Sequence, residues 1–272
     1  MNLVWAGLIV LVVSTVAIAA MLLVRRGAPE GSYFEDGDRA SGIFGVLATG
    51  FAVLIGFVVF LSFESFDTSR SGAETEARTV VAQFETAQFL PVAARAKLSG
   101  DLVCYARAVV YQEWPKMQSN TLGDSRNPWT LSMLRTLRST DPRSASEQTA
   151  YAKWFDQRSD REDGRADRIH GAEGVIPVPV WIVLLLASVV IFIYMLFFAD
   201  SSERAIVQAT MMGGVAVVIT STLLLLVFLD HPYASGVGCL RPVAMERALV
   251  QLRQEQAFAR DRIIVPCDAR GF

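Results

Sequence analysis

Four apolar stretches interrupt this chain, and each is about as long as a helix that crosses a membrane. They cover residues 3–24, 43–63, 178–199 and 206–229, and none of them contains Asp, Glu, Lys or Arg. An α-helix needs about 20 such residues to span the hydrocarbon core, and it satisfies its own backbone hydrogen bonds there. The sequence therefore predicts an all-α integral membrane protein with four transmembrane helices in a lipid bilayer.

The composition is too apolar for a soluble globule, yet it leaves room for aqueous parts. Hydrophobic residues make up 52% and charged residues 19% of the 272 residues. This balance and the positions of the apolar stretches predict four parts. They are a first transmembrane pair (1–63), a helical extramembrane domain inserted between helices two and three (64–177), a second transmembrane pair (178–229) and a C-terminal helical tail packing on that domain (230–272).

Start and stop signals predict helices throughout the polar regions. Asn127 followed by proline is typical of a helix start, and Ser144 with Glu147 has the spacing of a capping box. Apolar residues at helical spacing from residue 73 onwards predict that helix two continues towards Pro91. A further helix is expected over 92–114, and Pro115 is expected to end it. A last helix is expected after Pro242. No strand-like alternation of useful length is present.

Arginine placement predicts the orientation in the membrane. Arg25, Arg26 and Arg39 follow the first apolar stretch and Arg204 lies between the last two, so the positive-inside rule places those short loops in the cytoplasm. The termini and the middle domain are then extracytoplasmic, in a bacterial inner membrane. The arginines in 161–168 favour the opposite orientation, although they alternate with acids in a long region to which the rule gives less weight.

The first apolar stretch is expected to remain as a membrane helix and not to be cleaved as a signal peptide. No basic residue precedes it, and its apolar run continues past the small residues that resemble a cleavage site.

The three cysteines allow a disulfide in this orientation. Cys239 and Cys267 flank the expected last helix, and the hypothesis is that they form a disulfide while Cys104 stays unpaired. The alternative is that all three are ordinary small apolar residues, since spacing alone does not establish the close Cα approach of a disulfide.

Several function classes lack their characteristic residues. Only two histidines, His170 and His231, are present, which argues against a zinc site, and no phosphate-binding glycine loop of the usual forms occurs. The net charge of −2, with mixed signs, argues against a nucleic-acid partner. We therefore expect neither an enzyme nor a cofactor.

The end of the second apolar stretch carries the best candidates for an ion pathway. Phe57, Phe60 and Phe63 recur every three residues, a spacing that suits a hydrophobic constriction in a ring of subunits. Glu64 and Asp67 follow one turn apart, and in a ring they would attract cations. The alternatives are that the rings pack against helices or lipid and that the acids are simply solvated.

Glycines lie along the same helix and in the fourth apolar stretch. Such residues allow close approach between membrane helices, so packing is the expected role of Gly42, Gly45, Gly50, Gly56, Gly213 and Gly214.

Four segments in a fixed order resemble the prokaryotic bestrophin-like family of four-helix membrane proteins of unassigned function. They are 42–67, in which FVVFLSFESF (57–66) closes helix two, 111–117 (YQEWPKM), 177–181 (PVPVW) and 229–233 (LDHPY). The likeness covers nearly the whole chain. The resemblance implies kinship with pentameric anion channels and a cytosolic region between helices two and three. The arginines predict the opposite side for that region, and the acidic pair fits poorly with an anion pathway.

Two functions from different classes follow from these observations. One is a homo-oligomeric bestrophin-like ion channel with the helical domain as its vestibule. The other is a non-conducting membrane sensor or envelope scaffold whose helical domain binds a ligand or a protein. The aromatic stripe favours the first, whereas the lack of charged residues inside the apolar stretches favours the second.

Overall fold

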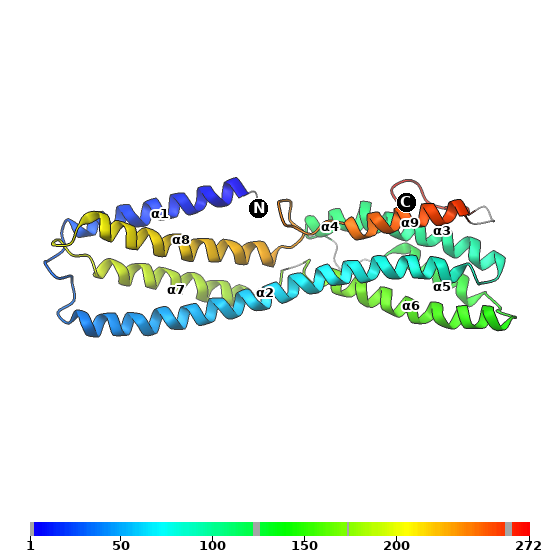
Figure 1. Cartoon of the computed structure of the whole chain (residues 1–272), viewed down its shortest axis with the longest axis horizontal. Coiled ribbons are helices and arrows are strands. Elements are labelled where there is room, and N and C mark those ends of the chain that lie inside the picture. The colour runs from blue at the N-terminus through cyan, green and yellow to red at the C-terminus, as the bar shows by residue number, and fades with distance from the viewer. Residues whose placement is uncertain (1–2, 122–125, 173, 259–262) are drawn as a thin grey trace. The chain divides into compact units, whose positions relative to one another are not determined.

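The computed structural model describes residues 3–121, 126–172, 174–258 and 263–272, and in these ranges the regular structure is helical (Figure 1). Two compact units are present. Unit 1 comprises Met1–Glu64, Gly174–Asp230 and Ser235–Gly238, and unit 2 comprises Ser65–Glu173, His231–Ala234 and Cys239–Phe272.

Four helices in the described chain are long and apolar enough to cross a membrane. They are α1 (Leu3–Arg25), α2 (Gly37–Ala87), α7 (Val178–Phe197) and α8 (Ala205–Asp230). The prediction of an all-helical chain with four apolar candidate spans is confirmed. The helix α2 has 51 residues without a proline, so it continues far beyond its apolar part, as the sequence predicts.

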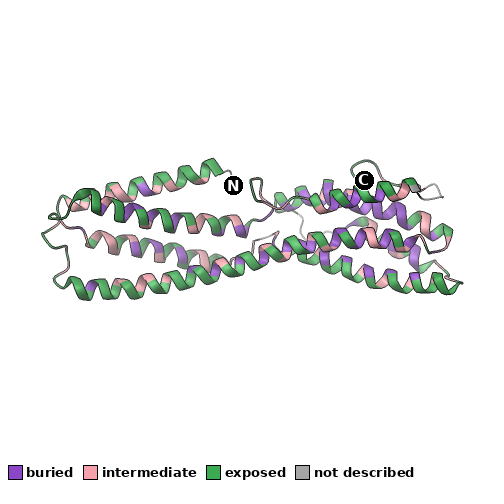
Figure 2. Cartoon of the chain, viewed as in Figure 1, coloured by how far each residue is buried: buried purple, intermediate pink, exposed green. Residues whose placement is uncertain are grey.

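In unit 1, α1 packs along α8, and α7 contacts both. Gly213 of α8 lies where a methyl group would come 2.9 Å from Ile18 Cδ1 of α1, so this glycine allows close packing of the two helices. A second cluster joins Ile55 and Val58 of α2 to Leu184 and Leu226. Most other apolar side chains of these helices are exposed, as Figure 2 shows, which is the pattern of surfaces that lipid or another subunit covers.

Unit 2 has the larger buried core (Figure 2). Its helices are the C-terminal part of α2, α3 (Val92–Ala108), α4 (Trp114–Gln118), α5 (Pro128–Arg138), α6 (Ala145–His170) and α9 (Val243–Phe258), with a π-helical turn, η1 (Val109–Glu113), between α3 and α4. Both predicted starts are confirmed. Asn127 accepts a hydrogen bond from the Trp129 amide at 3.2 Å, and Ser144 and Glu147 form the capping box.

The expectation that Pro115 ends its helix is wrong. The chain stays helical through Gln118, with Pro115 in the first turn of α4. Proline lacks the N–H that bonds to the preceding turn, and its ring crowds the carbonyl four residues earlier. The wider π turn directly before Pro115 changes this bonding pattern, so the proline is accommodated without breaking the helical path.

Candidate functional site

The candidate pore residues are all exposed on α2. Phe57, Phe60, Glu64 and Asp67 are spaced by three, four and three residues, so they fall within about 80° of one another on the helix circumference. We call these four residues the outward stripe. Phe63 flanks it. The three aromatic side chains are 63%, 62% and 57% exposed, and both acids are exposed.

The buried residues of the same part of α2 occupy roughly the opposite side of the helix. They are Ile55, Val58, Ser62, Ser65 and Ser69. Within the part of the chain that the structure describes, the outward stripe is therefore exposed and does not form part of a buried core. A methyl group added at Gly42, Gly45, Gly50 or Gly56 would have no atom of a neighbouring segment within 4 Å, so their expected packing role is not fulfilled within the described chain.

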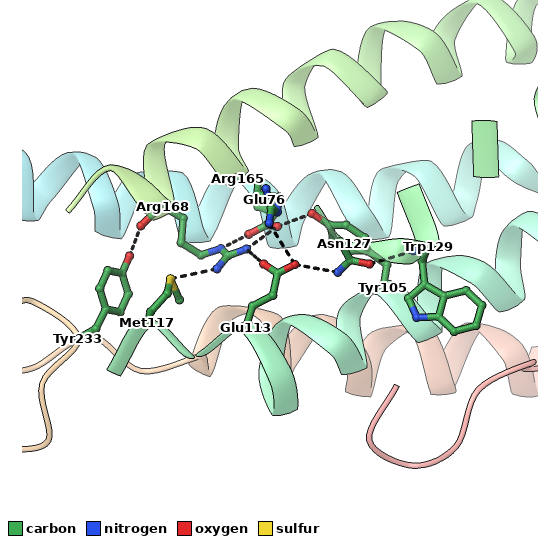
Figure 3. A network of polar contacts seen from close by, with 9 residues as sticks. All are labelled: Glu76, Tyr105, Glu113, Met117, Asn127, Trp129, Arg165, Arg168 and Tyr233. Atoms are coloured by element: carbon green, nitrogen blue, oxygen red, sulfur yellow. Dashed lines mark hydrogen bonds and ion pairs between the residues drawn. The ribbon is translucent and has the colours of Figure 1, made fainter. Parts of the chain in front are cut away.

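A second candidate site, which the sequence reasoning missed, is a buried network of charged and polar side chains in unit 2 (Figure 3). Its geometry depends on the crossing of α2 and α6 at Gly72 and Gly164. A methyl group on Gly72 would lie 2.5 Å from the Arg168 amide nitrogen, and one on Gly164 would lie 2.7 Å from the Glu76 amide nitrogen. The two helices approach this closely because neither position has a side chain, and the approach brings Arg168 against Glu76.

Arg168 binds two carboxylates at the centre of the network. Its Nε and Nη2 donate to the two oxygens of Glu76 at 2.5 and 3.1 Å, and Nη2 also donates to Glu113 Oε2 at 2.6 Å. The side chains of Arg168 and Glu76 are fully buried, and Glu113 is 7% exposed. A buried guanidinium is tolerated because both partners are charged and the contact with Glu76 is bidentate.

The π turn and the cap of α5 complete the surroundings of Glu113. Glu113 is the last residue of η1, and its Oε1 accepts hydrogen bonds from Asn127 Nδ2 at 3.0 Å and Arg165 Nη2 at 3.4 Å. Asn127 thus caps α5 with its oxygen and holds Glu113 with its nitrogen. One side chain links a local helix start to the buried charges.

These contacts shift the pKa values of the network. Burial by itself raises the pKa of Glu113, but Arg168 and Arg165 outweigh it and hold that pKa below its ordinary value. Burial raises the pKa of Tyr105 well above its ordinary value, and the Glu76 carboxylate beside it adds to the effect. The Tyr105 hydroxyl therefore stays protonated and donates to Glu76 Oε1.

Arg161, two turns before Arg168 on α6, is a second buried cation with weaker partners. Its Nη1 donates to Gln83 Oε1 at 2.7 Å, and its guanidinium lies 4.8 Å from the Tyr105 ring centroid and 5.9 Å from that of Trp154. Within the described part of the chain, its Nε and Nη2 have no hydrogen-bond partner. Burial accordingly lowers the pKa of Arg161.

Tyr233 joins the network from the segment after α8. Its hydroxyl donates to the backbone carbonyl of Arg168, and its ring packs edge-on against Trp114 at 5.4 Å. Burial raises the pKa of Tyr233 to about 12.

A signal for the network is present in the sequence of α6. Arg161, Arg165 and Arg168 recur at the spacing of one helix face. Because they also alternate with acids, the same stretch is typical of a solvated charged helix. The pattern alone therefore does not indicate that this face is buried.

The predicted pairing of Cys239 with Cys267 is wrong. Cys267 pairs with Cys104, with Cα atoms 5.7 Å apart, and Cys239 is free. The reason is the path of the chain after α9. The C-terminal segment 263–272 runs along α3, so that a methyl group on Gly100 would meet the Ile264 carbonyl oxygen, and this places Cys267 over Cys104.

Neither site has the donor set of a metal centre. Among the residues that the structure describes, no three His, Cys, Asp or Glu side chains are grouped to hold a metal ion. The network consists instead of two carboxylates neutralised by arginines, an arrangement that fixes helices in place.

A comparison with models of protein families shows which family the chain belongs to. A model of the bestrophin-like domain matches residues 10–238, which is most of the chain. The chain belongs to the bestrophin-like family. No curated protein matches at a significant level.

Solved bacterial bestrophin structures share this fold. One variant of a bestrophin homolog from Klebsiella pneumoniae has a TM-score of 0.65 and 14% identity, with 92% of this chain and 98% of that chain covered. Another variant of the same homolog has a TM-score of 0.67 and 15% identity over 93% and 99% of the two chains. A crystal structure described as a membrane protein gives 0.67 and 15% over the same shares. At this identity the likeness establishes the bestrophin fold alone.

Two of the four segments that carry the bestrophin-like resemblance meet in the buried network. The segment 111–117 supplies Glu113 and Met117 (Figure 3) and also Trp114, whose ring centroid lies 5.8 Å from the Arg168 guanidinium carbon. The segment 229–233 supplies Tyr233. Asp230 of the latter accepts hydrogen bonds from the Val175 and Ile176 amides at 2.7 and 2.9 Å, just before α7. The motifs 111–117 and 229–233 therefore have structural roles in this member of the family.

Proposed function

We propose that this bestrophin-like chain is a subunit of a homo-oligomeric ion channel in which the outward stripe of α2 narrows the pathway. The observation that carries the proposal is the placement of Phe57 and Phe60 on the face of α2 opposite its buried side. Exposed aromatic rings at such a position are expected to be covered by lipid or by another subunit. In a ring of subunits they form a hydrophobic constriction, which gates by dewetting.

The glycines of α2 support close contact with a second copy. Gly42, Gly45 and Gly56 lie on the same side of the helix as Phe60 and Phe63, and they face open space within the chain. Small residues on a membrane helix let the backbone of another helix approach. The same face thus combines small residues for helix contact with rings that narrow a passage.

The acidic pair indicates the preferred ion. Glu64 and Asp67 continue the outward stripe one turn beyond the rings, and both are exposed. Repeated around a ring of subunits, these carboxylates attract cations and repel anions. We therefore propose cation preference, although the bestrophin resemblance implies an anion pathway.

Planar bilayer recordings with the purified oligomer test the constriction. We expect the Phe57→Ala, Phe60→Ala double variant to conduct more than the wild type, because a wider and wetter constriction dewets less readily. Leu186→Ala on α7 removes an equally exposed apolar side chain outside the stripe and should leave conductance unchanged. Conductance that rises equally in both variants, or in neither, contradicts the assignment.

Reversal potentials in a salt gradient test the acidic pair. The Glu64→Gln, Asp67→Asn double variant should lose cation preference, whereas Asp38→Asn, an exposed acid in the first turn of α2, should retain it. Unchanged selectivity in the double variant removes these carboxylates from the pathway.

We further propose that unit 2 is extracytoplasmic, in a bacterial inner membrane. The arginines of the two short loops support this side, and so does the Cys104–Cys267 disulfide, because such bonds persist mainly in oxidising compartments. A reporter fused after Phe272 or inserted near Asn120 should behave as exported. Cytoplasmic activity at both positions reverses the orientation and agrees with the bestrophin resemblance.

A non-conducting sensor or scaffold is the second candidate. It is favoured by the four apolar stretches, which contain no Asp, Glu, Lys or Arg, and by the buried charge network, which lies in unit 2. Transport pathways usually contain buried ionisable groups in the membrane. An oligomer of defined mass that gives no conductance in bilayers under any tested voltage supports this candidate.

A further inference from the structure

A pocket of about 340 Å³ opens on unit 2 between α3, α5 and the C-terminal segment. Besides two alanines of α3, it is lined by Lys97, Asp101, Trp129, Ser132, Ile264 and Pro266. Its size is at the lower end for small-molecule sites, so it suits a ligand of few heavy atoms. The pocket shares no residue with the outward stripe, and it shares Trp129, whose amide donates to Asn127, with the buried network.

The wall formed by the C-terminal segment is held at several points. Cys267 is bonded to Cys104 of α3, and Arg107 Nη1 donates to the Asp268 carbonyl at 2.9 Å. The Trp129 indole N–H donates to the Gly271 carbonyl at 3.0 Å, which also fixes the ring that lines the pocket. Fixed walls favour binding because little ordering is required when a ligand enters.

Two opposite charges border an otherwise mostly apolar surface. Lys97 and Asp101 are one turn apart on α3, with Lys97 exposed and Asp101 only 1% exposed. Burial raises the pKa of the Asp101 carboxyl and Ser132 opposes that rise, and within the described residues Oδ2 of Asp101 has no hydrogen-bond partner. A buried carboxylate oxygen without a hydrogen bond is costly, and a charged donor from a ligand relieves that cost.

We propose that this pocket binds a free α-amino acid with an apolar side chain. Its ammonium group pairs with the Asp101 carboxylate, whose buried side chain turns toward the pocket when the ligand enters, and its carboxylate lies beside the Lys97 ammonium. Its side chain packs against Trp129, Ile264 and Pro266. A zwitterion uses both charges of the border at once, whereas a simple amine leaves Lys97 unpaired and a simple acid leaves Asp101 unpaired.

Calorimetric titration of the full-length protein in detergent tests this with three probes. They are L-phenylalanine, phenethylamine, which lacks the carboxylate, and 3-phenylpropanoate, which lacks the ammonium group. We expect L-phenylalanine to bind and the other two to bind about tenfold more weakly or worse, since each leaves one charge unpaired. The Asp101→Asn and Lys97→Met variants should each weaken L-phenylalanine binding by a similar factor.

The control is Lys153→Met, an exposed lysine at a separate shallow hollow between α2 and α6. It should bind L-phenylalanine like the wild type. Asn has the shape of Asp, so Asp101→Asn should fold, and its thermal unfolding is recorded alongside. If Asp101→Asn fails to fold, the affinities of the three probes for the wild type and the affinity of L-phenylalanine for Lys97→Met test the proposal. Absence of L-phenylalanine binding at millimolar concentration, equal binding of phenethylamine, or unchanged affinity in the folded Asp101→Asn variant overturns the proposal.

Discussion

Arg168 links separate segments of unit 2 through buried contacts. It lies at zero exposure between Glu76 and Glu113, and its own backbone carbonyl accepts the Tyr233 hydroxyl. Paired charges at this depth gain little over an apolar core, but removal of one partner leaves the others unpaired. The network therefore serves more to specify which helices meet than to add stability.

Replacement of Arg168 by Met should lower the free energy of unfolding by about 3–5 kcal/mol, because two buried carboxylates lose their cation. The matched control is Arg158→Met on the same helix, whose ion pair with Glu162 is partly exposed and should contribute under about 1 kcal/mol. Denaturant unfolding in detergent, followed by tryptophan fluorescence, measures both. Equal losses in the two variants contradict a special role for Arg168.

Acid should destabilise the protein partly through Glu113. Its folded pKa is lower than the ordinary value of 4.5, so its contribution to stability is fully present above that value and is lost as the pH falls through the folded pKa. Glu113→Gln lacks this titration. The difference in melting temperature between wild type and Glu113→Gln should therefore be largest near neutral pH and shrink below about pH 4.5. A constant difference across the acid range argues against the pairing.

At the scale of elements, the crossing of α2 and α6 depends on two glycines. The backbone of each helix occupies the space that a side chain of the other would need, and a methyl group at either glycine would lie 2.5–2.7 Å from it. Such contacts with backbone atoms do not relax by rotation of a side chain. The crossing determines the distance from Arg168 to Glu76, so packing and electrostatics are coupled at this point.

Gly164→Ala should destabilise the protein by about 1–3 kcal/mol, because α2 and α6 must separate to admit the methyl group. Gly214→Ala in α8 is the control, since its added methyl group would have nothing within 4 Å, and its effect should stay within about 0.5 kcal/mol. Thermal unfolding in detergent compares them. A neutral Gly164→Ala would falsify the close crossing.

At the scale of the whole molecule, a covalent bond joins parts of the chain that are 163 residues apart in the sequence. It attaches the C-terminal segment to α3 and thereby closes the wall of the small pocket. Because the bond restricts the unfolded chain over a long loop, its effect on stability is expected to be substantial.

Cys267→Ser should lower stability by about 2–4 kcal/mol, whereas Cys239→Ser, at a free cysteine, should change it little. Mass analysis of peptides prepared without reductant, after blocking of free thiols, should find Cys104 joined to Cys267 and Cys239 alkylated. A peptide pair that contains Cys239 contradicts the described connectivity.

The sequence by itself determined the helical class, the four apolar spans, the caps at Asn127 and Ser144 and the likeness to bestrophins. These properties depend on local hydrophobicity, spacing and capping chemistry, which the chain carries wherever it folds. Tertiary structure alone decided that Arg168 pairs with Glu76 and Glu113, that Cys267 selects Cys104, and that Pro115 lies inside a helical path. Each of these depends on the approach of segments distant in sequence or on the detailed path of the backbone. The sequence pattern does not contain such distances, for example the close approach of α2 and α6 that Gly72 and Gly164 permit.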